Sequence, residues 1–501
     1  MPKLDGLSPE EAELLVLQSA VSKADEIKGL RLVGNPKVQE MLAIVERFIQ
    51  RKRLVLYGGT AINLLLPKAD QFYDERKEIP DLDFWSSDAL ADSRELADIY
   101  AKAGFDVEGK SSVHQGTFKT RANGIAVADI TQMPPTLFKN VQKLAVPVKI
   151  NKFTVLVAPP DMLRMSMYLE LSRPQGDTSR YEKVMKRLTV FNKHYPIETP
   201  SKKACHKRGA NQDVFTSDQY DAVVGKLIDS KVVFFGAFAA QKYFKTDRSK
   251  FKGTEELPFD LLSNNAEHDA DTVQKFVQKM LNDKRKVTVT FHSAVSETLP
   301  VNYEVKVGAT TVALFYKPSA CHNYNVVPFR GKRLKIATID TMFSFYFSFV
   351  FANKPYLDTD RIRCIAHHLF VLQSKHRASK KGIFRRFNLS CIGRQQTMEG
   401  IILKKAQMFE KLKDDKNSVE YQKWFYKYEP NAAKTKTKLA KQVTEEENSI
   451  ENQRSYLVTR KSQKGDKRRK RSTAKRRKIR TNRRAPKRKN ARKTRRRWFN
   501  F

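Results

Sequence analysis

The pattern of apolar and polar positions between residues 8 and 52 predicts two helices. Ser8 and Pro9 provide an N-cap followed by proline at the first helical position, and two glutamates come next. A second helix is predicted over 37–51, because apolar residues return every three or four positions. They are Val38, Met41, Leu42, Val45, Phe48 and Ile49. The pattern predicts an N-terminal helical region, residues 1–52, whose two helices pack against the domain that comes next in the chain.

From residue 53 the pattern changes to short apolar runs that alternate with helical stretches. Such alternation is typical of an α/β unit with a mixed sheet, and we expect this unit over 53–156. Helices are predicted at 61–66 and 87–103, and strands at 54–57, 81–85, 105–107, 116–121 and 125–130. Residues 157–225 form a helical extension, in which Pro159-Pro160-Asp161 caps one helix and residues 181–195 form another.

The chain then repeats itself weakly at an offset of about 178 residues. Four segments of the first half have counterparts, in the same order, in the second half. Residues 54–62, 79–86, 126–130 and 158–161 correspond to 232–240, 257–263, 311–315 and 337–340. Chance similarity between two α/β domains is the alternative explanation. The order of the four matches favours a second copy of the fold over 226–430.

The second copy lacks most of the acids of the first. Gly59 becomes Ala237, Asp81 becomes Pro258 or Phe259, and Asp129 becomes Leu314 or Phe315. At most one acid, Asp260, is retained. We therefore expect a degenerate domain that serves packing or RNA binding.

Positive charge is concentrated at one end of the chain but is not confined to it. The net charge is +41, and residues 460–497 hold 23 Lys and Arg against one acid. The remaining chain still carries +19, which is typical of a polyanion binder, with nucleic acid as the first candidate and an anionic membrane as the second. Residues 431–501 are polar and charged, which predicts a charged linker. From about residue 460 the chain has too few apolar residues and too many like charges for a packed core, which predicts a disordered basic tail.

Four scattered cysteines, at positions 205, 321, 364 and 391, show no Cys-x-x-Cys spacing. The spacing argues against a disulfide framework and a structural zinc site, and favours a reducing compartment. His206, His367 and His368 lie near two of the cysteines, but a zinc site needs four converging ligands and ordinary packing is the default interpretation. No secretion signal and no apolar run of about 20 residues is present, so we expect neither export nor a membrane span.

Candidate chemistry begins with the acids Asp81 and Asp83. Residues two apart in a strand point to the same face, so the two carboxylates would lie side by side. A pair of Mg²⁺ ions would offset their repulsion and could bind the attacking and leaving oxygens of a phosphoryl displacement. Asp129 is a third candidate, because an acid in the apolar run 125–130 is costly unless it is paired or binds metal. The alternatives are turn acids in a solvated loop and, for Asp129, an exposed strand end.

Gly58, Gly59 and Thr60 come where a predicted strand gives way to a helix. Glycine allows a phosphate to approach the backbone, and the helix N-terminus offers unpaired N–H groups. A Gly-Gly pair alone is usually a plain turn. The order of strand, Gly-Gly, helix, Asp-x-Asp and a later Asp favours catalysis.

This order of motifs resembles the polymerase-β-like nucleotidyltransferase superfamily. The long spacer of 21 residues between Gly59 and Asp81, and the residues of 54–138, resemble a narrower family. That family is the poly(A) polymerase catalytic subunit of large nucleocytoplasmic DNA viruses of the poxvirus, asfarvirus and giant-virus type. Fainter likeness continues through 180–187 and 390–397.

The resemblance implies an α/β (α+β) fold in which a nucleotidyltransferase mixed sheet flanked by helices is followed by a degenerate copy. It implies Asp81, Asp83 and Asp129 as catalytic metal ligands for Mg²⁺ or Mn²⁺, Gly58, Gly59 and Thr60 as the phosphate-side turn, and ATP as the substrate. Arg180, Lys183 and Arg187 share a helix face and are expected to contact the triphosphate or RNA, a solvated basic face being the alternative.

The predicted function is template-independent addition of AMP from ATP to mRNA 3′ ends. Uridylyl transfer, oligoadenylate synthesis and a non-catalytic role in RNA binding or virion packaging remain as alternatives. The expected partners are an RNA 3′ end and ATP, without a membrane, and the expected location is the host cytoplasm, in the viral factory, and the virion. The sequence does not decide whether processivity comes from a homodimer, a viral processivity subunit or the tail.

Overall fold

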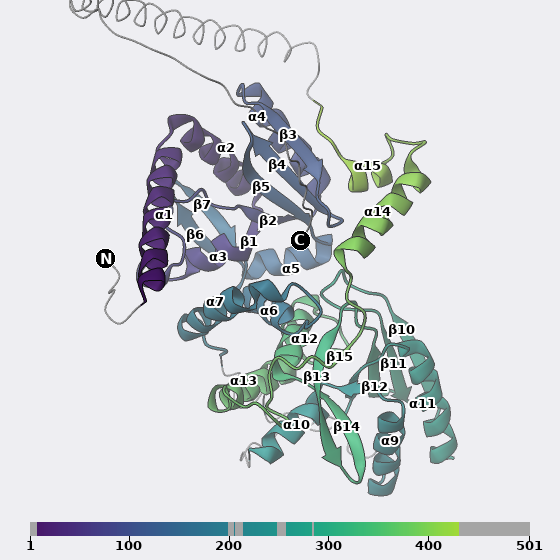
Figure 1. Cartoon of the computed structure of the whole chain (residues 1–501). Coiled ribbons are helices and arrows are strands. Elements are labelled where there is room, and N and C mark those ends of the chain that lie inside the picture. The colour runs from purple at the N-terminus through teal and green to yellow at the C-terminus, as the bar shows by residue number, and fades with distance from the viewer. Residues whose placement is uncertain (1–7, 199–204, 206–213, 248–256, 283–284, 430–501) are drawn as a thin grey trace, which may run out of the picture. The chain divides into compact units, whose positions relative to one another are not determined.

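The computed structural model describes residues 8–198, 205, 214–247, 257–282 and 285–429. The predicted basic tail lies outside the described residues. Two sheets lie within one compact unit, which spans residues 1–430 (Figure 1). No helix among the described residues is both long enough and apolar enough to cross a bilayer.

The first sheet has seven strands in the order β3-β4-β5-β2-β1-β7-β6. Its central strands are buried on both faces because helices cover the sheet, so Val55 and Leu56 are fully buried. The strands are β1 (Val55–Tyr57), β2 (Asp83–Ser86), β3 (Val107–Ser111), β4 (Thr117–Ala122), β5 (Ile125–Gln132), β6 (Val146–Ile150) and β7 (Phe153–Val157). The helices of this half are α1 (Pro9–Val33), α2 (Pro36–Lys52), α3 (Gly58–Leu65), α4 (Ala89–Lys102), α5 (Pro135–Leu144), α6 (Pro160–Leu171) and α7 (Tyr181–His194).

The two N-terminal helices differ in how they pack. Helix α2 buries its predicted apolar face, including Val45 and Phe48, and contacts β7 and α4. Helix α1 buries only Val33, and its leucines Leu14 and Leu17 are exposed. The prediction that both helices pack against the next domain is therefore wrong for most of α1, whose apolar residues do not form one strong face.

The second sheet has eight strands in the order β10-β11-β12-β9-β8-β14-β13-β15. Helix α12 lies in the hydrophobic core of this half of the protein, and every residue of the helix is buried. The strands are β8 (Val233–Phe234), β9 (Phe259–Leu262), β10 (Val287–His292), β11 (Asn302–Val307), β12 (Thr310–Tyr316), β13 (His322–Phe329), β14 (Lys332–Ala337) and β15 (Cys391–Ile392). The helices are α9 (Ser217–Asp229), α10 (Ala237–Thr246), α11 (Ala266–Leu281), α12 (Ile339–Ala352), α13 (Thr359–Lys375), α14 (Met398–Leu412) and α15 (Val419–Phe425).

The two sheets share one topology, which confirms the predicted repeat. Taking β3 to correspond to β10, the next six strands match in order, and only β15 is additional. The directions match as well: β1 pairs antiparallel with β2 and parallel with β7, as β8 does with β9 and β14. Strand β5 also pairs parallel with β2, as β12 does with β9. The register of these two strand pairs therefore shows which residues of the two sheets are equivalent.

Local polar contacts are repeated too. In the first half the Ser86 hydroxyl lies 2.5 Å from Asp92 Oδ2, and in the second half Ser263 pairs with Asp269 at the start of the equivalent helix. In the first half His194 binds Asp70, and in the second half His376 binds Asp247. Side-chain pairs at equivalent places, in addition to shared strand order, indicate two copies of one unit. They contact each other through the equivalent helices α6 and α12.

The four cysteines form two disulfides, Cys205–Cys364 and Cys321–Cys391. The prediction of unpaired cysteines is therefore wrong. The partners are 159 and 70 residues apart in sequence, so the fold brings them together and their spacing gives no local signal.

Candidate active site

The predicted acids lie at adjacent positions of the first sheet. Strand β2 pairs parallel with β5, and the pairing sets Asp83 directly beside Asp129. Asp81 precedes β2 by two residues and is exposed, so it belongs to the loop and not to the predicted strand. Leu82 between them is buried, and this alternation keeps the two acids on one side of the chain.

Gly58 lies against one of these carboxylates, that of Asp83. Its φ is +76°, and a Cβ atom there would lie 2.5 Å from Asp83 Oδ2. Gly59 follows within α3, where a Cβ would lie 3.0 Å from both an Arg187 guanidinium nitrogen and the Tyr73 hydroxyl. Because neither glycine has a side chain, the acids and a basic pocket can both lie close to the N-terminus of α3.

The carboxylates repel one another and are partly removed from water. Burial, and then the charges of Asp81 and Asp129, raise the pKa of Asp83 to about 7. Asp81 is exposed as a residue, but partial removal of its carboxylate from water and then the charge of Asp129 raise its pKa as well. Lys119, which faces Asp129 across the β4–β5 pairing, forms an ion pair with it and lowers both of these pKa values. Such a group of acids favours an added positive charge.

The acids are more widely spread than a closed metal cluster, because their ligand atoms do not all lie within 4.8 Å of one another. The donor set nevertheless suits a hard divalent cation, since all three groups are carboxylates. A cation bound to these carboxylates would compete with Lys119 for Asp129.

Polar residues of α3 hold the loop segments of the site in place. The Thr60 hydroxyl is buried and donates to the carbonyl oxygen of Asp81 at 2.7 Å. Asn63 Oδ1 accepts from the backbone N–H groups of Phe72 and Tyr73, at 2.9 and 3.0 Å. Thr60 thus positions Asp81, and its predicted nucleotide contact stays a prediction. Asn63 was not among the predicted residues, although its place one helical turn after Gly59 is visible in the sequence.

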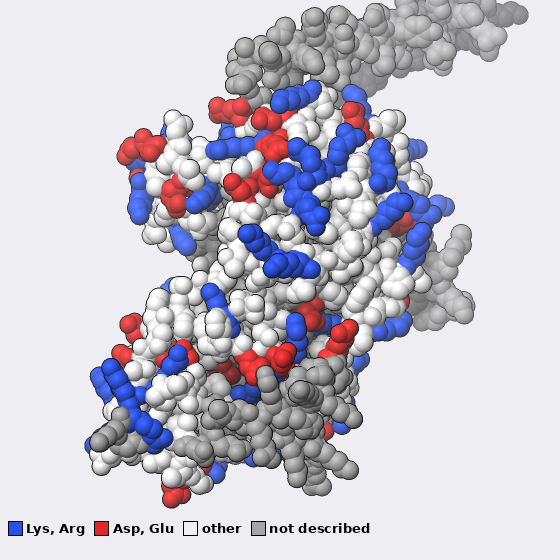
Figure 2. All heavy atoms as spheres, turned by 180° about the vertical axis from the view of Figure 1, so that it is seen from behind, with Lys and Arg blue, Asp and Glu red and all other residues white. Residues whose placement is uncertain are grey.

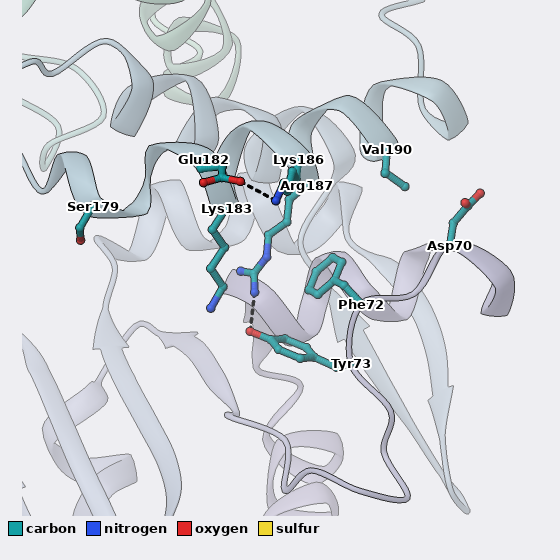
Figure 3. A pocket seen from close by; sticks show the side chains of 9 residues that line it. All are labelled: Asp70, Phe72, Tyr73, Ser179, Glu182, Lys183, Lys186, Arg187 and Val190. Carbon is teal, nitrogen blue, oxygen red and sulfur yellow. Dashed lines mark hydrogen bonds and ion pairs between the residues drawn. The ribbon is translucent and has the colours of Figure 1, made fainter. Parts of the chain in front are cut away.

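A pocket of about 500 Å³ opens between α7 and the loop that carries Phe72 and Tyr73. Figure 3 shows Lys183 and Arg187 pointing from α7 toward this loop. The Arg187 guanidinium lies 4.3 Å from the centre of the Phe72 ring and donates to the Tyr73 hydroxyl at 2.5 Å. Aromatic rings beside basic groups suit a nucleotide, whose base stacks and whose phosphates are anionic. The two aromatic residues were not predicted, since no motif marks them.

The three predicted basic residues divide into two groups. Lys183 and Arg187 line the pocket. Arg180 forms an ion pair with Glu170, with 3.0 Å between guanidinium nitrogen and carboxylate oxygen, and its charge lowers the pKa of Asp83. Arg180 therefore acts on the acids at longer range. On the face drawn in Figure 2, Lys and Arg gather over the half that holds the first sheet.

The second sheet lacks this arrangement. The register sets Asp260 opposite Leu314 where the first sheet has Asp83 opposite Asp129. Asp81 then corresponds to Pro258, and Gly59 to Ala237. The predicted loss of acids is confirmed at these positions, and the described residues of the second sheet do not repeat the group of three carboxylates.

Comparison with known proteins agrees with this geometry. Residues 43–177 match the family model described as the poly(A) polymerase catalytic subunit. They include both glycines and all three acids. This segment is therefore similar to that family.

Two curated relatives come from African swine fever virus, where each is described as a candidate poly(A) polymerase catalytic subunit. The protein of strain Badajoz 1971 Vero-adapted is 32% identical over 194 residues, which are 37% of this chain and 39% of the relative. The protein of isolate Pig/Kenya/KEN-50/1950 is 31% identical over 185 residues, 35% of this chain and 38% of the relative. The chain thus spans about two fifths of the length of these relatives.

A solved structure extends the likeness of fold beyond the family segment. The crystal structure of the Megavirus polyadenylate synthase matches with a TM-score of 0.69 and 17% identity. The match covers 89% of this chain and 91% of the other. The predicted fold class, a mixed α/β nucleotidyltransferase sheet followed by a second such domain, is therefore confirmed.

Proposed function

We propose that the chain is a template-independent poly(A) polymerase that transfers AMP from ATP to the 3′ end of RNA and releases pyrophosphate. One observation carries the proposal: Gly58 and Gly59 join a group of three acids to a basic, aromatic pocket at the N-terminus of α3. The family match of residues 43–177 and the polyadenylate synthase fold support it.

The pocket residues would bind and orient the nucleotide. Phe72 and Tyr73 offer ring faces for the base, and Lys183 and Arg187 offer positive charge for the phosphates. The free N–H groups at the start of α3 would add hydrogen bonds to phosphate oxygens. The bound triphosphate would then extend across Gly59 toward Asp83.

The acids fit a divalent cation, Mg²⁺ or Mn²⁺, and the environment of Asp83 supports this fit. Its pKa of about 7 reflects burial first and the neighbouring carboxylates second, and both disfavour its negative charge in the absence of a counterion. Asp81, Asp83 and Asp129 would hold the ion, which when bound lowers the pKa of an RNA 3′-hydroxyl and neutralises charge on the leaving group. Thr60 and the β2–β5 pairing keep the carboxylates in place.

Nucleotide choice is the direct test. An untagged full-length protein, an RNA primer and one nucleoside triphosphate at a time should give long extension with ATP and little with UTP, CTP or GTP. Preferential use of UTP would replace the proposal with uridylyl transfer. Products made from ATP without any primer would indicate oligoadenylate synthesis.

A role limited to RNA binding or packaging predicts a different result. Replacing Asp81 and Asp83 together by alanine should abolish extension while the affinity for RNA stays within about twofold, because the acids do not contribute positive charge. Unchanged extension by this double variant would show that the acids are not catalytic. Replacing Asp74 and Asp88 by alanine is the matched control, since both are loop acids of the same half.

A further inference from the structure

A second group of metal-binding side chains lies outside the active site, where the segment after α7 meets α13. Cys205, Cys364 and His368 each present one ligand atom, and the three atoms all lie within 4.8 Å of one another. No other three His, Cys, Asp or Glu side chains of the described residues converge in this way.

The backbone supports this convergence from two directions. Cys364 and His368 are four residues apart on α13 and so share one face of the helix. Cys205 comes from the other segment, with its Cα atom 5.5 Å from that of Cys364. Nearby, His367 Nδ1 lies 2.9 Å from the carbonyl oxygen of Ile197, so a residue shortly after α7 also contacts α13.

The ligand types select the metal. Two thiolates and one imidazole favour Zn²⁺ over Mg²⁺ or Ca²⁺, which prefer oxygen ligands. Both cysteines are buried and His368 is half-buried, so water can reach the fourth position of a tetrahedral ion.

The other disulfide shows that a cysteine pair alone does not produce this arrangement. Cys321 and Cys391 also have Cα atoms close together, at 5.3 Å. No third ligand of the described residues joins them within 4.8 Å. His368 thus distinguishes one cysteine pair from the other.

We propose that Cys205, Cys364 and His368 form a zinc site in the reduced protein, and that the Cys205–Cys364 disulfide is its oxidised, metal-free form. A thiol reductant supplies two electrons and two protons and converts the disulfide to two thiols. Zinc binding then releases one proton from each thiol as two S–Zn bonds form. Oxidation reverses the sequence: the S–S bond forms, two electrons pass to the oxidant, and zinc leaves.

Either state of the site links the same two parts of the chain. Cys205 comes after α7 of the first half in the chain, whereas Cys364 and His368 lie on α13 of the second half. The cysteines are 159 residues apart, and a link that closes a long loop restricts the unfolded chain most. Zinc would therefore keep the two halves joined under reducing conditions, where a disulfide would be lost.

The first experiment measures zinc in the untagged full-length protein, purified with a phosphine reductant. We expect one zinc per chain by inductively coupled plasma mass spectrometry, and zinc affinity lower by about 100-fold or more in Cys364→Ser and His368→Asn. Cys321→Ser, from the other pair, is the matched control and should keep its zinc. Absence of zinc from the reduced wild type, or full affinity in His368→Asn, would overturn the proposal.

A second experiment uses only the wild-type protein and so does not depend on how a variant folds. The reduced protein is alkylated with and without added zinc, digested, and its peptides are quantified by mass spectrometry. We expect zinc to protect Cys205 and Cys364 but not Cys321 and Cys391. Equal labelling of all four cysteines would contradict the site. Cobalt should give a thiolate charge-transfer band, which binding at the aspartates cannot produce.

Discussion

Gly58 faces Asp83 so closely that a Cβ atom on the glycine would lie 2.5 Å from Oδ2 of the carboxylate. A side chain at this position would displace an acid of the proposed metal site. We expect Gly58→Ala to lower kcat by about 100-fold, since an error of about 1 Å in a reacting group can cost that much.

A variant of Gly124 distinguishes the effect of backbone strain from the effect of a clash with Asp83. Gly124 has the same φ, +76°, but nothing within 4 Å of its would-be Cβ. Gly124→Ala should therefore share the backbone cost, about 1–2 kcal/mol, and keep kcat within about threefold. Steady-state extension of an RNA primer measures both variants. Equal losses would mean that backbone strain, and not displacement of Asp83, explains the effect.

Variants of Asp83 and Asp260 test whether only the first sheet takes part in catalysis. The two residues occupy equivalent positions, but only Asp83 pairs with another acid, Asp129. We expect Asp83→Asn to reduce kcat on the order of a thousandfold or more, because a metal ligand supplies several kcal/mol of transition-state stabilisation. Asp260→Asn should keep kcat within about twofold. A large loss in Asp260→Asn without a change in melting temperature would assign chemistry to the second sheet.

The sequence predicted the features that depend on local order. Strand, Gly-Gly, helix and Asp-x-Asp follow one another in the chain, so their pattern identified Asp83. The apolar run around Asp129 identified a second strand, and this order of elements predicted that the two acids lie on neighbouring strands. The repeat was detectable for the same reason, because the short segments around the two glycine turns kept their spacing.

Features that depend on the closed fold were not predictable. Tyr73 reaches Arg187, which is 114 residues away in sequence, only when the loop after α3 lies against α7. The cysteine partners are likewise brought together from distant segments, so that their spacing argued wrongly against pairing. Helix α1 was expected to pack against the next domain, but the capping signal at Ser8 and Pro9 predicts only that a helix begins there and not which of its faces is buried.

Metal binding at the acids should depend on pH with a defined sign. The pKa of Asp83 is raised to about 7 in the folded protein, from an ordinary value of 3.8. A raised carboxyl pKa destabilises the fold progressively as the pH rises through this window, since the charged form is disfavoured there. Mg²⁺ should remove this penalty, so the rise in melting temperature that Mg²⁺ causes should be larger at pH 8 than at pH 5.5.

The same measurement on two variants identifies the group. Asp83→Asn should lose most of the Mg²⁺ effect at pH 8. Asp260→Asn should retain it, although the pKa of Asp260 is also raised to about 7 by burial. If both variants retained the full effect, Mg²⁺ would bind elsewhere.

Arg187 should matter for nucleotide affinity more than for chemistry. Its planar guanidinium contacts the Phe72 ring and donates to Tyr73, and lysine cannot reproduce both contacts. We expect Arg187→Lys to raise the KM for ATP about tenfold, a cost of about 1.4 kcal/mol. Arg47→Lys is the matched control, because Arg47 lies over the Phe153 ring away from the pocket. A fall in kcat at unchanged KM would instead place Arg187 in the transition state.

Glu46 provides a prediction about stability that is separate from the active site. It lies buried on α2, where Asn151 donates to it at 2.9 Å, and burial raises its pKa to about 7 from 4.5. The charged form is therefore disfavoured in the folded state, and the fold loses stability as the pH rises from about 4.5 through 7. Glu46→Gln keeps an oxygen for Asn151 without the charge. At pH 8 it should stabilise the protein by up to about 3 kcal/mol, and at pH 5 it should have little effect.

Glu40 lies exposed on the same helix, and Glu40→Gln is the matched control for helix propensity and net charge. Melting followed by circular dichroism at pH 5 and pH 8 compares the two variants with the wild type. Only Glu46→Gln should raise the melting temperature at pH 8. If it lowered the melting temperature at both values, the carboxylate would be stabilising in its charged form, and α2 would depend on an ionic contact that burial alone does not explain.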